Sequence, residues 1–247
     1  MKVAILTTNT IHHIYFIQQA IAYNLDIYIF CAKPKLSKNY KSFDYSFESQ
    51  KKLFETKRDK YELLKWFNAK HVDISMFSNL SIVDSVNSPE SIIKIDKISP
   101  DLILVFGTGL IKETLLNNFK NKIFNLHGGN PEKYRGLDSH YWSIYHRDFE
   151  GLITTLHEVE PEFDTGNIIL QGKINLWPNM QLHELRASNT ELCFELFKSL
   201  VNMYQKNEKV YGKKQKTLGR YYSMMPEVLK HDVSVKFEKY IALNFSK

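Results

Sequence analysis

The chain opens with MKVAILTTNTIHHIYFIQQAIAYNLDIYIFC (residues 1–31), and this stretch indicates the fold class. Val3–Thr7 is an apolar run of strand length, and Leu25–Cys31 is a second one, rich in isoleucine and aromatic residues. Between them, residues 10–23 are predicted to form a helix, because apolar residues recur there at helical spacing. The residues of that apolar face are Ile14, Ile17, Ala20 and Ile21. A strand–helix–strand opening predicts a doubly wound (Rossmann-like), mostly parallel α/β sheet.

The rest of the chain continues the alternation of strands and helices. DLILVF (101–106) is almost wholly apolar, as in strands buried on both faces, and KIFNL (122–126) is similar. Further strands are predicted at 152–159 and from residue 168. Helices are predicted at 51–67, 88–98, 139–147 and 181–206, the last being the longest, and loops at 32–50 and 128–137. We expect one domain over 1–206 and a small C-terminal appendage over 207–247, made of short strand-like runs and basic turns.

Composition limits the classes of function. The chain has 247 residues and a net charge of +6 from 33 basic and 27 acidic residues. This charge fits either a lysine-rich surface or attraction to an anionic ligand. No nucleic-acid-binding motif accompanies it, so no nucleic-acid partner is predicted.

Cysteine usage and hydropathy bear on the compartment. Cys31 and Cys193 stand far apart in apolar stretches, which favours buried free thiols in a reducing compartment. The N-terminal apolar run is too short for a signal peptide, and no run reaches the ~18 apolar residues of a membrane span. We therefore expect a cytoplasmic protein without membrane contact.

Polar residues with catalytic potential follow the predicted strand at 122–126. Asn125 and His127 are two apart, so they share one face of the strand. Ligands of open α/β sheets bind beyond the carboxyl ends of the strands, where these two side chains point. Asp164 begins an Asp-Thr-Gly turn 37 residues later, after one helix and one strand that can return the chain to the same edge.

These three residue types suit acyl transfer to an amine. A fixed amide N–H at Asn125 could stabilise the negative charge on the carbonyl oxygen by ~3 kcal/mol. The imidazole of His127 could take the proton of the amine, and the carboxylate of Asp164 would set the tautomer and favour the imidazolium. Each motif alone is a weak signal, because Asp-Thr-Gly is a common turn and most histidines lie on the surface or in the core. Their combination carries the prediction.

Together, NLHGGNPEKYRG (125–136) and DTGNII (164–169) resemble the N10-formyltetrahydrofolate-dependent formyltransferases. The resemblance covers about residues 1–206, the predicted catalytic domain, and places the family's catalytic roles on Asn125, His127 and Asp164. It implies N10-formyltetrahydrofolate as cosubstrate and no metal. It also implies folate contacts at LVFGTGLI and at the loop before Asp164. Those residues are Phe106, Gly107, Thr108, Gly109, Leu110, Glu162 and Phe163; the alternative for the two glycines is a plain strand-to-helix turn.

The loop after His127 indicates the branch of the family. The more common family sequence there is Ser-Leu-Leu-Pro, whereas this chain has Gly129-Asn130-Pro131. The chain is most similar to the dTDP-linked amino-sugar enzymes, which implies a homodimer and a role in cell-surface glycans such as lipopolysaccharide O-antigen. Whether the amine is at C3 or C4 is left open. The predicted substrate contacts are Asn9, His12, Gly129, Asn130, Tyr134, Arg135, Trp142, Arg220, Tyr221 and Tyr222.

Several of these contacts have structural alternatives. Tyr221 and Tyr222 could stack on a base or pack the appendage, and His12 with His13 could bind an anion at a helix N-terminus or be solvated capping residues. Trp142 and its neighbour Tyr141 could wall the cleft on one side and pack in the core on the other. Four lysines in the 32–50 loop could meet phosphates or stay solvated; they are Lys33, Lys35, Lys38 and Lys41.

Three rival functions remain. A methionyl-tRNA formyltransferase would need an extension of ~100 residues for tRNA, and only about 40 follow the helix at 181–206. A glycinamide ribonucleotide formyltransferase would have His-Pro-Ser-Leu-Leu-Pro after the asparagine, and here Gly128 follows His127. A catalytically silent folate- or nucleotide-binding module is disfavoured by the intact catalytic set.

Overall fold

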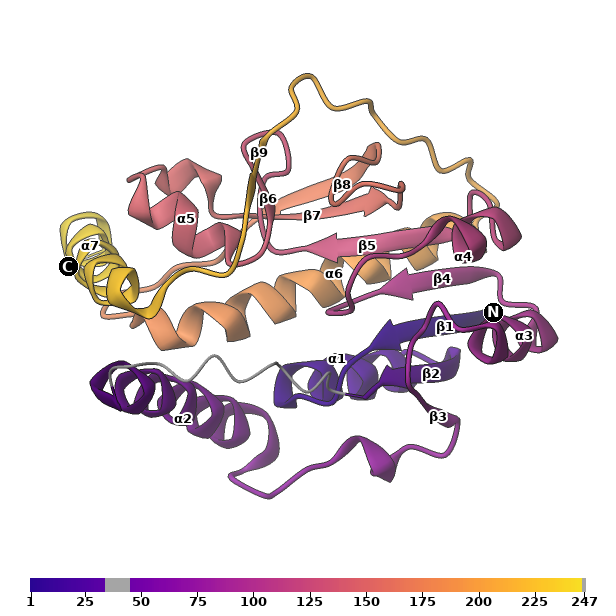
Figure 1. Cartoon of the computed structure of the whole chain (residues 1–247), viewed down its shortest axis with the longest axis horizontal. Helices are drawn as coiled ribbons and strands as arrows, with labels where there is room; N and C mark the ends of the chain where they lie inside the picture. Colours follow the sequence, from indigo (N-terminus) through magenta and orange to yellow (C-terminus); the bar gives the residue numbers. More distant parts are fainter. Residues whose placement is uncertain (34–44, 246–247) are drawn as a thin grey trace.

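The strand–helix–strand opening builds one side of a seven-stranded sheet in the computed structural model, which describes residues 1–33 and 45–245. The strands are β1 (Lys2–Thr7), β2 (Asp26–Ala32), β3 (Leu80–Val83), β4 (Leu102–Val105), β5 (Ile123–His127), β7 (Ile153–Glu158) and β8 (Ile168–Lys173). Their order is β3-β2-β1-β4-β5-β7-β8 (Figure 1). The pairings among β1 to β5 are parallel, whereas β7 is antiparallel to β5 and β8. The predicted doubly wound, mostly parallel sheet is confirmed.

Helices cover both faces of the sheet because its central strands are apolar on both sides. The helices are α1 (Ile11–Ala22), α2 (Tyr45–Phe67), α3 (Pro89–Ile98), α4 (Glu113–Asn118), α5 (Ser139–Tyr145), α6 (Leu185–Gln205) and α7 (Glu227–Phe245). In β1, Val3 and Ile5 pack in one cluster with α1 and α6, while Ala4 and Leu6 pack in another with α3 and α4. This alternation follows from the period of two in a strand.

The N-terminal half departs from the sequence prediction in three places. Helix α2 begins at Tyr45 instead of residue 51, because Tyr45–Gln50 contains no glycine or proline to delay it. With 23 residues it is longer than α6 with 21, so the prediction that the helix at 181–206 is the longest is wrong. In α1 the buried face centres on Phe16, Ile17 and Ala20, and Ile21 at its edge is 43% exposed. Strand β3 and helix α4 had not been predicted.

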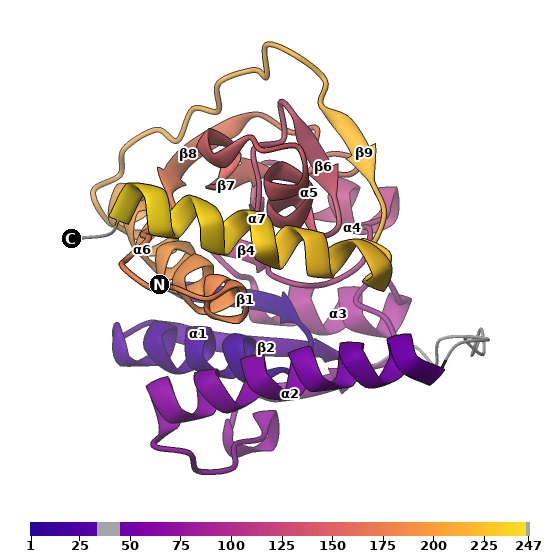
Figure 2. The same cartoon turned by 90° about the vertical axis from the view of Figure 1, so that its left-hand side faces the viewer.

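The segment after α6 is more ordered than predicted. Within the predicted loop, β6 (Tyr134–Gly136) pairs in parallel with β9 (Arg220–Tyr222), and we call this pair the β6–β9 ribbon. Instead of further short strands and turns, α7 follows as a 19-residue helix. Its buried Val233, Phe237 and Ile241 recur every four residues and pack in a cluster with α5, alongside which α7 lies (Figure 2).

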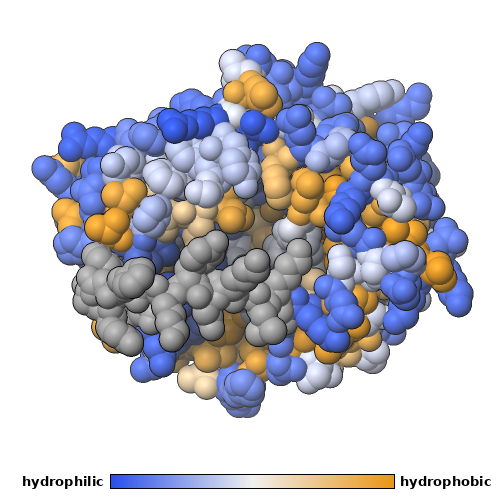
Figure 3. Space-filling view, viewed as in Figure 1, coloured by the Kyte–Doolittle hydropathy of each residue, from blue (hydrophilic) through white to orange (hydrophobic). Residues whose placement is uncertain are grey.

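Other predictions concern the surface and the thiols. Cys31 and Cys193 are buried free thiols, as predicted. Lys33 forms an exposed ion pair with Asp84, and Lys35, Lys38 and Lys41 lie outside the described residues. Hydrophilic side chains dominate the face drawn in Figure 3, with apolar ones in separate patches. Within residues 1–33 and 45–245, no helix is both long and apolar enough to cross a membrane.

Candidate active site

A cavity of about 480 Å³ lies beyond the carboxyl ends of β4 and β5. This volume falls in the range of small-molecule sites. Its lining comes from the start of α1, the segment after β4, the end of β5, the start of α5, the loop before Asp164, and parts of α2 and α6. Ligands of open α/β sheets bind at this edge, so the fold itself positions the cavity.

His127 is the last residue of β5 and is 6% exposed. Its Nε2 lies 2.9 Å from the carbonyl oxygen of Tyr134, and because a carbonyl only accepts, Nε2 carries the hydrogen. Its Nδ1 therefore has the free lone pair and faces Oδ2 of Asp164 at 3.4 Å. Gly129 allows this packing, since a Cβ there would come within 2.7 Å of Nε2. The tautomer is thus set by Tyr134, not by Asp164 as predicted.

Asp164 connects the polar groups of the site. Its backbone has a φ of 55°, in the left-handed region that aspartate tolerates better than most residues, and its side chain points inward. Oδ2 accepts a hydrogen bond of 2.7 Å from the N–H of Gly136 and faces His127, while Oδ1 lies 3.4 Å from Nδ2 of Asn125. Burial raises the pKa of Asp164, but the two histidines beside it and the Gly136 N–H outweigh burial and hold the pKa at about 2. The carboxylate is therefore charged at neutral pH.

His157 is the site residue that the sequence analysis missed. It lies on β7 directly opposite Asn125 in the strand register. Its Nδ1 donates to the carbonyl of Glu158 at 2.6 Å, so its Nε2 accepts from Nδ2 of Asn125 at 3.1 Å. The same Nε2 is 3.4 Å from Oδ1 of Asp164. Only the β5–β7 register brings this imidazole to Asn125, and no local sequence signal marks it. We call these four residues, Asn125, His127, His157 and Asp164, the β5 end.

Burial and charge act in opposite directions on His127. Burial lowers its pKa below the usual value, whereas the nearby Asp164 carboxylate and the Tyr134 carbonyl raise it. The neutral imidazole is therefore the resting form, and a proton taken up at Nδ1 meets a carboxylate. This arrangement suits a group that accepts a proton and holds it transiently.

All the residues predicted to contact folate line the cavity. Phe106 and Gly107 follow β4 directly, and the carbonyl of Leu110 accepts a hydrogen bond of 2.9 Å from Asn87. Leu110 and Phe163 are 39% and 37% exposed, and both present apolar surface. This end of the cavity combines apolar side chains with irregular backbone, as in sites that hold flat heterocycles.

Of the ten predicted substrate contacts, only His12 lines the cavity as the described residues define it. Three others bond to other parts of the chain. Asn9 donates to Asp73, and the Asn130 side chain accepts from the N–H of Glu132. The carbonyl of Gly129 accepts from the hydroxyl of Thr155. These bonds hold segments of the chain in place.

The other six lie in or against the β6–β9 ribbon. The hydroxyl of Tyr134 donates to Asp148, and Nε of Arg135 donates to the carbonyl of Gly219. Nε1 of Trp142 donates to the carbonyl of Ser223. Arg220 lies over the ring of Tyr222, Tyr222 packs against Trp142, and Tyr221 lies against Phe163; the structure therefore shows these side chains in contact with one another.

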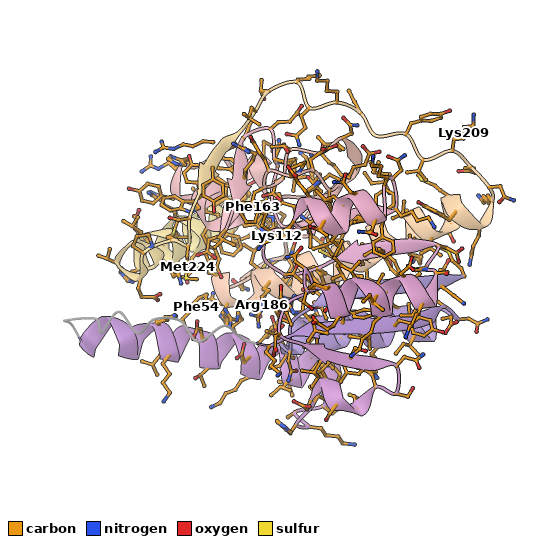
Figure 4. All side chains as sticks on the ribbon, turned by 45° about the vertical axis from the view of Figure 1, so that its right-hand side comes forward. Phe54, Lys112, Phe163, Arg186, Lys209 and Met224 are labelled. Carbon is orange, nitrogen blue, oxygen red and sulfur yellow. The ribbon has the colours of Figure 1, made fainter. Side chains whose placement is uncertain are left out.

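A different set of residues forms the end of the cavity away from Phe163. They come from α2, α5, α6 and the segment around α7. Figure 4 shows Phe54, Arg186 and Met224, which lie in this part of the cavity. The set is Phe54, Arg58, Tyr141, Arg186, Met224 and Lys230. Arg186 is fixed by Glu62, which is fully buried, through contacts of 2.6 and 2.7 Å. We call this the cationic end.

Of the two histidines at the start of α1, His13 is buried, so the solvated alternative is wrong for it, whereas His12 is half-buried. His13 is 4% exposed, and the rings of His12 and His13 lie 3.9 Å apart beside Phe106. Burial lowers the pKa of both, that of His13 to about 3. Two neutral imidazoles therefore face the cavity.

Comparison with known proteins identifies the family. Residues 1–200 match the family described as formyl transferase. The chain belongs to this family. The assignment made from the Asn-x-His and Asp-Thr-Gly stretches is confirmed. No group of three or more His, Cys, Asp or Glu side chains in the described part of this formyl transferase is arranged to hold a metal ion.

Relatives of this formyl transferase differ in what they act on. The methionyl-tRNA formyltransferase of Finegoldia magna is 29% identical over 177 residues, which cover 66% of this chain and 57% of the relative. The match thus spans little more than half of that relative's length. The formyltransferase PseJ of Anoxybacillus kamchatkensis, solved with UDP-4,6-dideoxy-4-formamido-L-AltNAc and tetrahydrofolate, is similar in fold. Its TM-score is 0.52 at 17% identity, covering 99% of this chain and 92% of PseJ.

A second similar fold is glycinamide ribonucleotide transformylase 1 of Symbiobacterium toebii. Its TM-score is 0.59 at 13% identity, and the match covers 89% of this chain and 94% of that one. These structures share the fold with the formyl transferase described here. Which amine accepts the formyl group depends on this chain's own residues.

Proposed function

We propose that this formyl transferase moves the formyl group of N10-formyltetrahydrofolate to the amine of a nucleotide-linked amino sugar, most simply a dTDP-amino-dideoxyhexose. One observation carries the proposal: a single cavity has the β5 end in its wall, an apolar end beside Phe163 and a cationic end beside Arg58. The folate fits the apolar end, where Leu110 and Phe163 offer surface to a flat ring. It supplies the activated formyl carbonyl.

The chain's own residues then have distinct tasks. Nδ2 of Asn125 keeps its hydrogen bond to His157. Its second hydrogen, which makes the longer contact of 3.4 Å with Asp164, turns toward the carbonyl oxygen of the formyl group. An oxyanion-hole donor of this kind is worth ~3 kcal/mol. Nδ1 of His127 takes the proton that the attacking amine loses, and Asp164 stabilises the resulting imidazolium. The burial of these groups limits competition from water.

The cationic end supports an anionic amine substrate. Arg58 and Arg186 line it, together with Lys51 and Lys230, and each of these four side chains also forms an ion pair with a carboxylate of the chain. A nucleotide-sugar brings a diphosphate, which arginine binds well. PseJ, whose fold matches nearly the whole of this chain, was solved with a nucleotide-sugar product and tetrahydrofolate, which supports the same class here.

Mass spectrometry tests this proposal. The enzyme is incubated with N10-formyltetrahydrofolate and a panel of dTDP- and UDP-linked 3-amino and 4-amino sugars, with glycinamide ribonucleotide and methionyl-tRNA as further arms. We expect a sugar to gain the mass of one formyl group. Turnover of glycinamide ribonucleotide or methionyl-tRNA without any sugar would overturn the sugar assignment. We also propose that the enzyme is a homodimer, and sedimentation measures its oligomeric state. We further propose that its product is used in cell-surface glycans.

Methionyl-tRNA is the second candidate, because the Finegoldia relative acts on it by name. The two candidates differ in salt dependence. Binding of tRNA through many phosphates weakens steeply with salt, while a nucleotide-sugar with two phosphates loses affinity gently. Titration of dTDP and of uncharged tRNA at low and moderate salt separates them, and tight tRNA binding without dTDP binding would favour the tRNA function.

A further inference from the structure

His13 has a buried nitrogen that no described residue uses. Its Nε2 has no hydrogen-bond partner among the described residues, although the side chain is 4% exposed and lines the cavity. Buried polar atoms in folded proteins nearly always have a partner. An orphaned one in the wall of a ligand cavity points to a ligand.

The other ring nitrogen fixes what Nε2 can do. Nδ1 of His13 lies 3.0 Å from the carbonyl oxygen of Thr8, which only accepts, so Nδ1 carries the hydrogen and the Thr10 hydroxyl at 2.8 Å acts as a second acceptor. Nε2 is then a lone-pair acceptor. Burial lowers the pKa of His13 to about 3, and the positive charge of Arg186 acts in the same direction, so the ring stays neutral at neutral pH. The group that completes this site must donate a hydrogen bond.

The position of the ring is set by the segment after β4 and by α1. The ring of His13 meets Phe106 edge-on at 4.7 Å, and Gly107 leaves room for it because a Cβ there would come within 2.3 Å of Nε2. Gly107 has a φ of 82°, which a side chain would also strain. Val105, next to Phe106, pairs with Asn125 in the register. His13 therefore lies one strand away from Asn125, and Arg186 of the cationic end is close enough for its positive charge to lower the pKa of this ring, which associates the ring with the amine substrate.

We propose that Nε2 of His13 accepts a hydrogen bond from a hydroxyl or amine N–H of the amine substrate and so selects substrates that carry a donor at that point. The identification of that substrate as an amino sugar rests on the proposed function, and a hexose ring offers such hydroxyls. A buried polar site of this kind discriminates strongly against analogues that lack the matching group, because it is then left unpaired.

Two variants isolate the role of Nε2. His13→Asn places an amide near Nδ1, which can keep the bond to Thr8, and removes the acceptor at the Nε2 position; His13→Gln restores an amide oxygen near that position. His71→Asn, at an exposed site, is the matched control. With dTDP-4-amino-4,6-dideoxyglucose as substrate, we expect His13→Asn to raise the KM of the sugar roughly 5- to 100-fold, with the KM of the folate changing less than about twofold. His13→Gln should recover part of this loss. The His71→Asn control should leave both KM values unchanged.

An unchanged sugar KM in His13→Asn, or an equal rise in the folate KM, would overturn the proposal. If the wild type formylates glycinamide ribonucleotide and no sugar, the proposed function fails, and the same variants measured with that amine still test His13. If the variants do not fold, histidine-labelled wild-type protein gives a second readout by ¹⁵N NMR. The resonance of one unprotonated Nε2 should move when the amine substrate is added and not when 5-formyltetrahydrofolate alone is added; no movement contradicts the proposal.

Discussion

The stretch FNLHGGNPEKYRG (124–136) feeds two regions of the molecule that use polar residues differently. Its first part ends β5 and contributes Asn125 and His127 to the β5 end, where buried polar groups border a cavity. Its last part forms β6 in the β6–β9 ribbon, where Arg135 and its neighbours bond to protein groups. The comparison teaches that polar groups which satisfy one another hold structure, whereas polar groups at a cavity are available for chemistry.

The largest expected effect is at His127. His127→Asn replaces the basic Nδ1 that faces Asp164 with an amide that is not basic, so the amine loses its proton acceptor. We expect kcat to fall about 10²- to 10⁴-fold, with a much smaller change in the KM of the amine substrate. Steady-state kinetics at neutral pH check this, and near-wild-type turnover would show that the β5 end does not carry the proton transfer.

Asn125→Ala should be next in size. The variant loses the amide N–H proposed for the oxyanion, and kcat should fall roughly 10²- to 10³-fold in a folded protein. Thermal melts run beside the kinetics separate the two possible roles of Asn125. A large drop in Tm with an unchanged kcat would mean that its bond to His157 is structural and nothing more.

Particular residues show how far the sequence reaches. The period of a strand places Asn125 and His127 on one face, and an apolar run identifies β4 and its neighbours, so the sheet and the position of these two residues at the cavity could be predicted. His157 could not, because its contact with Asn125 depends on the register of an antiparallel strand that joins β5. The ion pair of Glu62 with Arg186 joins residues 124 apart in sequence, and no local pattern marks such a pairing.

Most of the predicted substrate contacts lie outside the cavity for the same reason, because pairings between distant segments decide where they lie. Tyr221 and Tyr222 have the residue types of a base-stacking site, and only the pairing of β9 with β6 shows that they lie against other aromatic side chains. Likewise, Val233, Phe237 and Ile241 recur at helical spacing in α7, but only the structure shows that they pack against α5.

Acid should affect stability through buried histidines, outside the chemistry of the β5 end. Burial lowers the pKa of His140 to about 4 from 6.5, so the folded protein prefers its neutral form. Its contribution to stability is present above pH 6.5 and is lost as pH falls to 4, for about 3 kcal/mol in all. Chemical denaturation across this range measures the loss, and His140→Gln should show a shallower decline; an identical pH dependence in both proteins would contradict this account.

The smallest effect on catalysis is expected in the β6–β9 ribbon. Tyr222→Leu loses a hydroxyl bond to His146 and aromatic packing on Trp142, and should lower the unfolding free energy by about 1 kcal/mol. The KM of the amine substrate should change less than about twofold. If Tyr222 instead stacked on the base of a nucleotide, the loss would be ~1–3 kcal/mol of binding, and a tenfold rise in KM would show it.

A crystal structure with 5-formyltetrahydrofolate and dTDP tests the central claim most directly, namely that the cavity beside the β5 end holds the formyl donor. The account predicts the folate ring against Phe106–Leu110 and Phe163, the formyl group within hydrogen-bond reach of Nδ2 of Asn125, and dTDP in the cationic end beside Arg58. A folate bound elsewhere, or a formyl group remote from both Asn125 and His127, would contradict it.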